Sequence, residues 1–123
     1  MLPVFHILKT AVEKVIAQGE RSFSNESGSC MYRHNGLCCV VGHMIPDDVY
    51  DPEMEVKRVA FLRDYLITPF QMEDLTLEQV SKVFEFLEEA QTVHDFHHPA
   101  EWEEGFHTIF ESIKTWEDSQ VFE

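Results

Sequence analysis

Residues 76–94 read TLEQVSKVFEFLEEAQTVH and form the clearest element of the chain. The first four match a capping box, in which the Thr76 hydroxyl accepts from the Gln79 amide and the Gln79 side chain reaches back. Covered side chains then recur every three or four residues, which is the spacing of one helix face. They are Leu77, Val80, Phe84, Leu87, Gln91 and His94, widened by Val83, Phe86, Ala90 and Val93. The stretch predicts a largely covered helix ending near His94.

A further helix is expected after this one. His97-His98-Pro99 interrupts the pattern, and proline suits the first turn of a new helix. Its first turn is acidic, which the helix dipole favours. The expected inner stripe is Trp102, Phe106, Ile109, Phe110, Ile113 and Trp116.

The preceding part of the chain mixes helix and strand signals. Residues 4–17 have helical apolar spacing and stop at Gly19, and a polar, Ser-rich connection occupies 20–29. Asn35-Gly36 lies between two β-prone runs, which predicts a hairpin with strands near 29–33 and 37–41. Residues 43–55 should form turns. Residues 56–67 predict a helix with Val59, Leu62, Tyr65 and Leu66 facing inward.

These elements indicate one α+β domain over residues 1–123, mostly α, with about four helices packed against one small β-hairpin. A hydrophobic content of 44% with ten Phe excludes a disordered acidic tail. No run of 18 apolar residues occurs and no signal peptide is recognised, so we expect a cytoplasmic protein that does not enter a membrane.

Charge is distributed very unevenly along the chain. Residues 71–123 contain fourteen acids and two bases, whereas residues 1–70 contain nine acids and seven bases, so 12 of the 14 net negative charges lie in the last part. Such a field repels phosphate backbones and attracts basic surfaces. The carboxylates expected outside the two inner stripes are Glu78, Glu85, Glu88, Glu89, Glu103, Glu104, Glu111 and Asp118. They predict an acidic face for a protein partner, or a solvated face that serves solubility.

The segment from Cys30 to Glu55 is the richest in side chains that can bind a ligand or take part in catalysis. Tyr32, Arg33, Cys38 and His43 are candidates for a small-ligand pocket at the hairpin, with Tyr32 stacking and Arg33 on a phosphate. Structural pairing of Arg33 with a carboxylate, Glu53 or Glu55, is the favoured interpretation of this residue, and an anionic ligand is the alternative.

Thiol and metal chemistry are the remaining alternatives. Cys38 or Cys39 with His43 resembles a nucleophile pair without a known signature. Cys30 and Cys38 do not have the spacing that is usual for zinc ligands. The three cysteines fit small buried residues in a reduced compartment. His94 and His98 would share one face only if the helix continued past Pro99. We therefore expect no bound metal and no cofactor.

Two blocks resemble a family of small uncharacterised proteins of tailed bacteriophages. The first is CMYR at 30–33 with GLCCVVGHMIPDDVYDPEME at 36–55, and the second is QTVHD at 91–95 with Trp102 shortly after. With the helix ending in Gln18-Gly19, the resemblance covers most of the chain. Cys39 and Val40 stand where small residues are expected, and Val56 where Gly is expected. No reaction or cofactor is assigned to that family, so the resemblance carries over no functional residue.

The leading hypothesis is a phage accessory protein that acts on the host by binding rather than by catalysis. Its acidic helical face would meet the basic surface of a nucleic-acid-binding host protein and compete with nucleic acid there, by analogy with other acidic phage proteins. The alternatives are a binder of a nucleotide signal at the hairpin and a metal- or thiol-dependent enzyme. The sequence predicts no direct contact with nucleic acid and leaves the oligomeric state open.

Overall fold

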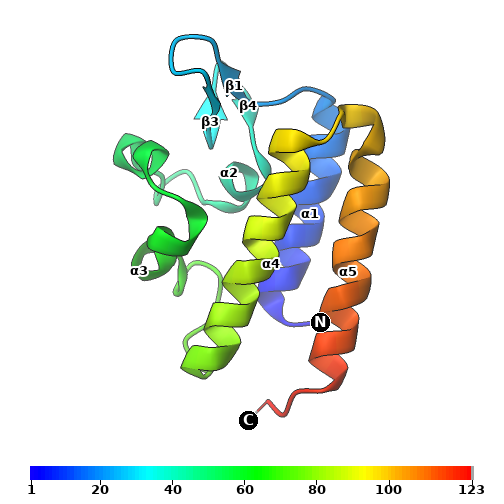
Figure 1. Cartoon of the computed structure of the whole chain (residues 1–123). Helices are drawn as coiled ribbons and strands as arrows, with labels where there is room; N and C mark the ends of the chain where they lie inside the picture. Colours follow the sequence, from blue (N-terminus) through cyan, green and yellow to red (C-terminus); the bar gives the residue numbers. More distant parts are fainter. Residues whose placement is uncertain (123) are drawn as a thin grey trace.

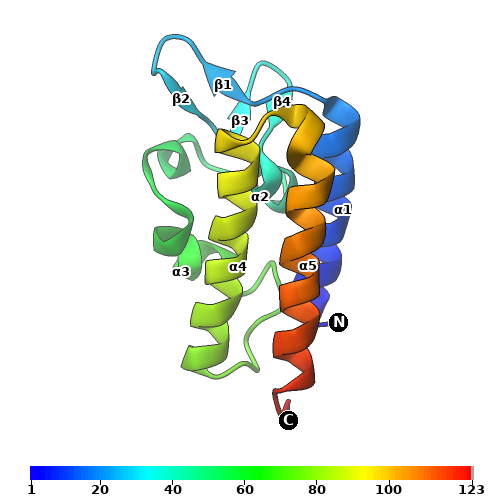
Figure 2. The same ribbon diagram turned by 45° about the vertical axis from the view of Figure 1, so that its right-hand side comes forward.

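Three long helices form the body of the molecule in the computed structural model, which describes residues 1–122. They are α1 (Pro3–Gln18), α4 (Leu77–Phe96) and α5 (Trp102–Asp118), and they stand side by side with α4 antiparallel to α5 (Figures 1 and 2). Short strands lie at the end where α1 and α4 finish. The mostly helical α+β architecture expected from the sequence is confirmed.

The long helices begin and end largely as predicted. The Thr76 hydroxyl accepts from Gln79 N at 3.1 Å and Gln79 Oε1 accepts from Thr76 N at 3.0 Å, so the capping box is present. Pro99 begins a short 3₁₀ turn, η3 (Pro99–Glu101), that leads into α5. Leu77 is a correction: it is 85% exposed because it lies in the first turn, beyond the packed part of α4.

The predicted hairpin is smaller than expected, and the structure contains a second short hairpin. β3 (Arg33–His34) pairs with β4 (Leu37–Cys38) around Asn35-Gly36, both of which have positive φ. A second antiparallel pair, β1 (Phe23–Ser24) with β2 (Ser29–Cys30), lies in the segment expected to be a plain connection. Two short hairpins therefore occupy the place of the single predicted one.

Residues 40–41 are helical, not the end of a strand. α2 (Val40–Met44) begins after Cys39, whose sulfur accepts from Gly42 N at 3.3 Å. Val40 and Val41 are both fully buried, because this short helix packs against α1 and α4. Burial on both sides overrides the strand propensity of two consecutive valines.

The predicted helix over 56–67 is broken into short turns. These are η1 (Pro52–Val56), η2 (Val59–Leu62) and α3 (Arg63–Leu66), with extended backbone at Lys57 and Arg58. Tyr32 Oη donates to Lys57 O at 2.6 Å, which ties the extended part to the hairpin. Val59, Leu62 and Leu66 are buried as expected, whereas Tyr65 is 43% exposed.

The buried side chains of all these elements form one hydrophobic core, with Phe5, Phe84, Trp102 and Phe106 among its largest members. Over residues 1–122, no helix combines the length and the hydropathy that a membrane span requires.

Candidate functional site

Glu55 ties the 30–55 block together. Its carboxylate accepts from Tyr32 N at 2.8 Å, from Arg33 N at 3.0 Å and from Tyr50 Oη at 2.5 Å. Burial, then the hydrogen bond to Glu55, raises the pKa of Tyr50 to about 12. These contacts join the hairpin to η1, so this carboxylate has a structural role.

Arg33 is paired, but with a residue other than the two expected. Its guanidinium reaches Asp47 Oδ1 at 2.8 Å, donates to Ile45 O at 2.6 Å and lies 4.5 Å from the Tyr50 ring centre. Neither Glu53 nor Glu55 pairs with its side chain, because Glu55 is already engaged by backbone N–H groups. The sequence identified a paired arginine and missed its partner.

The four candidate ligand residues divide between two cavities. Tyr32 is buried, and lines a cavity of about 320 Å³ together with Cys30 and Asp95. Arg33, Cys38 and His43 line a different cavity of about 350 Å³. Neighbouring residues of an extended segment point to opposite sides, which separates Tyr32 from Arg33. Tyr32 therefore does not line the cavity formed by the other three.

All three thiols are free, and none is activated. Cys30 lies opposite Phe23 and Cys38 opposite Arg33, so the two cysteines do not face each other across a hairpin. Burial raises the pKa of Cys38 and of Cys39, and raises that of Cys30 to about 12. A nucleophilic cysteine needs the opposite shift. The raised pKa of Cys38 therefore disfavours a thiolate beside His43.

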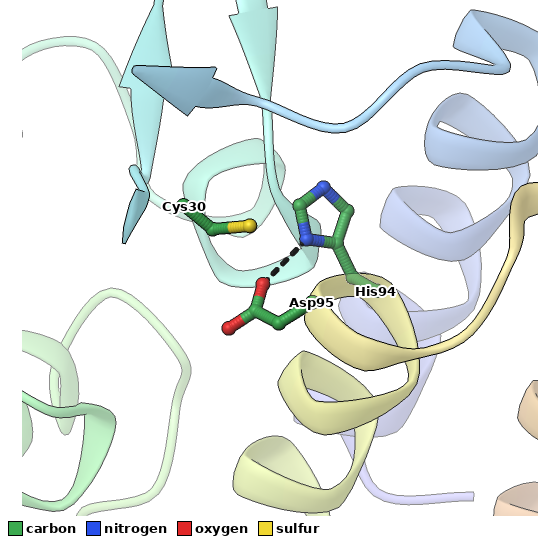
Figure 3. A group of neighbouring side chains, drawn as sticks. All are labelled: Cys30, His94 and Asp95. Carbon is green, nitrogen blue, oxygen red and sulfur yellow. Dashed lines mark hydrogen bonds and ion pairs between the residues drawn. The ribbon is translucent and has the colours of Figure 1, made fainter. Parts of the chain in front are cut away.

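Cys30, His94 and Asp95 form a compact polar cluster (Figure 3). One potential ligand atom from each lies within 4.8 Å of the others, with Cys30 on β2 and the other two in the last turn of α4. His94 is fully buried and stacks on Trp102, with ring centres 5.4 Å apart. Sequence spacing did not suggest this group, because Cys30 is distant from the other two along the chain.

Hydrogen bonding assigns both nitrogens of His94. Nε2 accepts the backbone N–H of Ser22 at 3.3 Å, so the neutral ring has its proton on Nδ1, which donates to Asp95 Oδ1 at 2.7 Å. A metal at Nδ1 would require a proton on Nε2, directed at the Ser22 N–H. This arrangement fits a structural histidine better than a metal ligand.

His98 does not share a face with His94. α4 ends at Phe96, and the exposed His98 accepts the N–H of Ala100 at its Nδ1. The carbonyl groups at this helix end accept instead from Arg21, at 3.1 Å for His94 O and by a short contact to His97 O. A cation at a helix C-terminus is favourable. Only a tertiary contact could reveal this role of Arg21.

Part of the predicted acidic face lies along the seam between α4 and α5. We call this surface the acidic groove; its lining includes Glu85, Glu88, Glu89 and Glu111 with Thr92, Val93, Thr108 and Ile109. Gly105 lies against Val93, and a Cβ there would be 2.9 Å from Val93 Cγ1, so the helices approach closely at the floor. The result is an apolar floor with an acidic rim.

Cations offset only part of the rim charge. Glu85 pairs with Lys82 at 3.2 Å and Glu88 with Arg58 at 3.7 Å, and Glu111 contacts His107 at 2.9 Å. Glu89 has no ion pair within the described chain.

The other predicted acidic residues are less concentrated. Asp118 lines a separate hollow beside the N-terminus with Leu2 and Lys114. Glu78, Glu103 and Glu104 are exposed, but they do not line the acidic groove. The structure thus brings four of the predicted carboxylates to one groove and leaves four outside it.

Comparison with known proteins gives no relative: no family model, no curated protein and no solved structure matches this chain.

Proposed function

We propose that this protein acts by binding, and that the acidic groove takes up a basic, partly apolar segment of another protein. Support comes from the carboxylates of Glu85, Glu88, Glu89 and Glu111 around the buried side chains of Val93 and Ile109. A basic side chain can meet the rim while its apolar stem or neighbour covers the floor. A rim with more carboxylates than bases also speeds encounter with a positive surface.

The expected partner is a host protein that uses the same basic surface for nucleic acid, because a surface that neutralises phosphates is rich in Lys and Arg. The resemblance to tailed-phage proteins makes a bacterial host the source of that partner. In this hypothesis the groove competes with nucleic acid and performs no reaction. Exposed ion pairs contribute about 0.2–1 kcal/mol each, so several of them must act together.

The test is a charge reversal confined to the groove. A triple variant, Glu85→Lys with Glu89→Lys and Glu111→Lys, replaces three exposed carboxylates that hold no backbone contact. Glu88 is left in place, because it accepts from Ala60 N at 3.3 Å. The matched control, Glu13→Lys with Glu20→Lys and Glu26→Lys, makes the same charge change at exposed positions outside the groove.

Both variants and the unaltered protein are used as bait in bacterial lysate at low and high salt. We expect the unaltered protein and the control to retain the same host protein at low salt, and the groove variant to lose it. The retained protein should be displaced by high salt and by duplex DNA. A partner that the groove variant retains equally well, or that ignores ionic strength, would rule out the acidic groove as the binding surface.

A further inference from the structure

A group of positive and protonatable side chains lies on another part of the molecule. Lys14 from α1, Arg33 from β3 and His43 from α2 line one cavity of about 350 Å³, beside Cys38 and Asp47. The chain as a whole carries a net charge of -14. Two of its nine Lys and Arg residues thus converge with a histidine at one hollow, from three separate elements.

Positive charges act on His43 at this cavity despite the net charge of the chain. Burial is the main cause that lowers the pKa of His43, and the charges of Lys14, His94 and Arg33 lower it further. Asp47 offsets part of this positive charge, because it pairs with Arg33 and raises the pKa of Cys38 in the same cavity. An anion that replaced Asp47 at Arg33 would meet the charges of Lys14 and Arg33 together.

Arg33 and Lys14 each retain N–H groups that could donate to a ligand. Arg33 Nε is buried and has no acceptor within the described chain, which is a costly state for a charged donor. Its partner Asp47 has a side chain that is 97% exposed, so the ion pair can open to solvent. Lys14 is exposed and forms no ion pair among residues 1–122.

The Gln18 amide sets the orientation of His43. Gln18 Oε1 accepts from Cys38 N at 3.1 Å, while Gln18 Nε2 donates to Cys38 O at 3.0 Å. The oxygen therefore faces His43 Nε2 at 3.0 Å, and that nitrogen donates. The Nδ1 of His43 has no protein partner within the described chain, and it can take up a proton when an anion arrives.

We propose that this cavity binds a phosphate group, either free or as the monoester of a small molecule, with Lys14, Arg33 and His43 as its donors. A guanidinium suits two phosphate oxygens, and a lysine adds a point charge. Because Tyr32 lies in the other cavity, no aromatic stacking on a base is part of this site. The site is independent of the acidic groove.

The experiment is an NMR titration of the full chain with inorganic phosphate, AMP and adenosine. Saturable shifts are expected at the amides of Lys14, Arg33, Cys38 and Gly42 with inorganic phosphate, with AMP or with both, and none with adenosine. Shifts with both identify the phosphate group as the recognised part, whereas shifts with AMP alone identify a monoester. Absence of saturable shifts with both phosphate compounds, or equal binding of adenosine and AMP, overturns the proposal.

Two substitutions test the donors without disturbing the packed Arg33. Lys14→Gln and His43→Gln should each weaken binding by about tenfold, the loss of one charge-assisted hydrogen bond. Lys9→Gln, at an exposed position on the same helix that lines a different hollow, is the matched control and should bind normally. Affinity that is unchanged in both test variants would also overturn the assignment.

Discussion

Gly42 lies directly against the carbonyl group of Tyr32. A Cβ at Gly42 would be 1.9 Å from the carbonyl oxygen and 2.7 Å from the carbonyl carbon of Tyr32. The same carbonyl accepts the backbone N–H of Cys39 at 3.1 Å. The start of α2 and the entry to the β3–β4 hairpin are therefore held in contact through backbone atoms.

Replacing Gly42 by alanine should destabilise the fold severely. The new Cβ would clash with backbone atoms of Tyr32, so no side chain can rotate to relieve the clash. We expect the free energy of unfolding to fall by about 3 kcal/mol or more. Urea denaturation followed by circular dichroism measures it. Gly105→Ala is the comparison, because its Cβ would meet the side chains of Val93 and His97 and no backbone atom of another element. Equal stability of both variants would contradict the close approach at Gly42.

Glu55→Gln should also destabilise the protein, by about 2 kcal/mol or more. The carboxylate accepts three hydrogen bonds, and an amide NH₂ in place of either oxygen would confront a backbone N–H, that of Tyr32 or that of Arg33. Glu53→Gln is the matched control two residues away, where the side chain is exposed. The control should stay within about 0.5 kcal/mol of the unaltered protein in the same denaturation experiment. If the Glu55 variant were as stable as the control, the Glu55 carboxylate would not have the structural role assigned to it.

His94 should have its neutral proton on Nδ1. The donor Ser22 N and the acceptor Asp95 Oδ1 select this tautomer together. Nitrogen chemical shifts of the imidazole at slightly alkaline pH distinguish the two forms. The exposed His107 serves as the comparison, since its Nε2 lies 2.9 Å from Glu111 Oε1 and the carboxylate favours the opposite, Nε2–H form there. Observation of the Nε2–H form at His94 would reopen the cluster as a metal site.

Zinc should consequently give no saturable stabilisation that depends on Cys30. A metal bound only to the folded state raises its stability with concentration. The thermal midpoint with and without zinc, compared between the unaltered protein and Cys30→Ser, measures this effect. A zinc-dependent rise that disappears in Cys30→Ser would contradict the tautomer assignment.

Alkaline pH should weaken the fold through the partly buried thiol of Cys30. The pKa of Cys30 is raised from 9.0 to about 12 by burial first, then by the charge of Asp95 and a hydrogen bond to it. The unfolded chain loses this proton at lower pH than the folded protein, so the stabilising contribution is complete below pH 9.0 and declines as pH rises toward about 12. Urea midpoints on both sides of pH 9.0 measure the decline. Cys30→Ser should decline less steeply, and an identical slope would exclude Cys30 as a contributor.

The long helices were predictable because local periodicity and capping determine them. The capping box at Thr76 and Gln79 is a contact between neighbours in the chain, and α4 begins where that pattern predicts. Asn35-Gly36 likewise determined a tight turn, since both residues adopt positive φ. The uneven charge was also visible directly in the composition.

Tertiary structure alone decided which side chains meet. The sequence indicated Arg33, Cys38 and His43 as candidates, but it did not indicate that Lys14 joins them or that Tyr32 lies in another cavity. Val40 and Val41 became helical because they are buried between α1 and α4, a packing effect that outweighs local propensity. Periodicity reports neighbours within one element, whereas the partners of Arg21 and His94 come from distant elements brought together by the shared core.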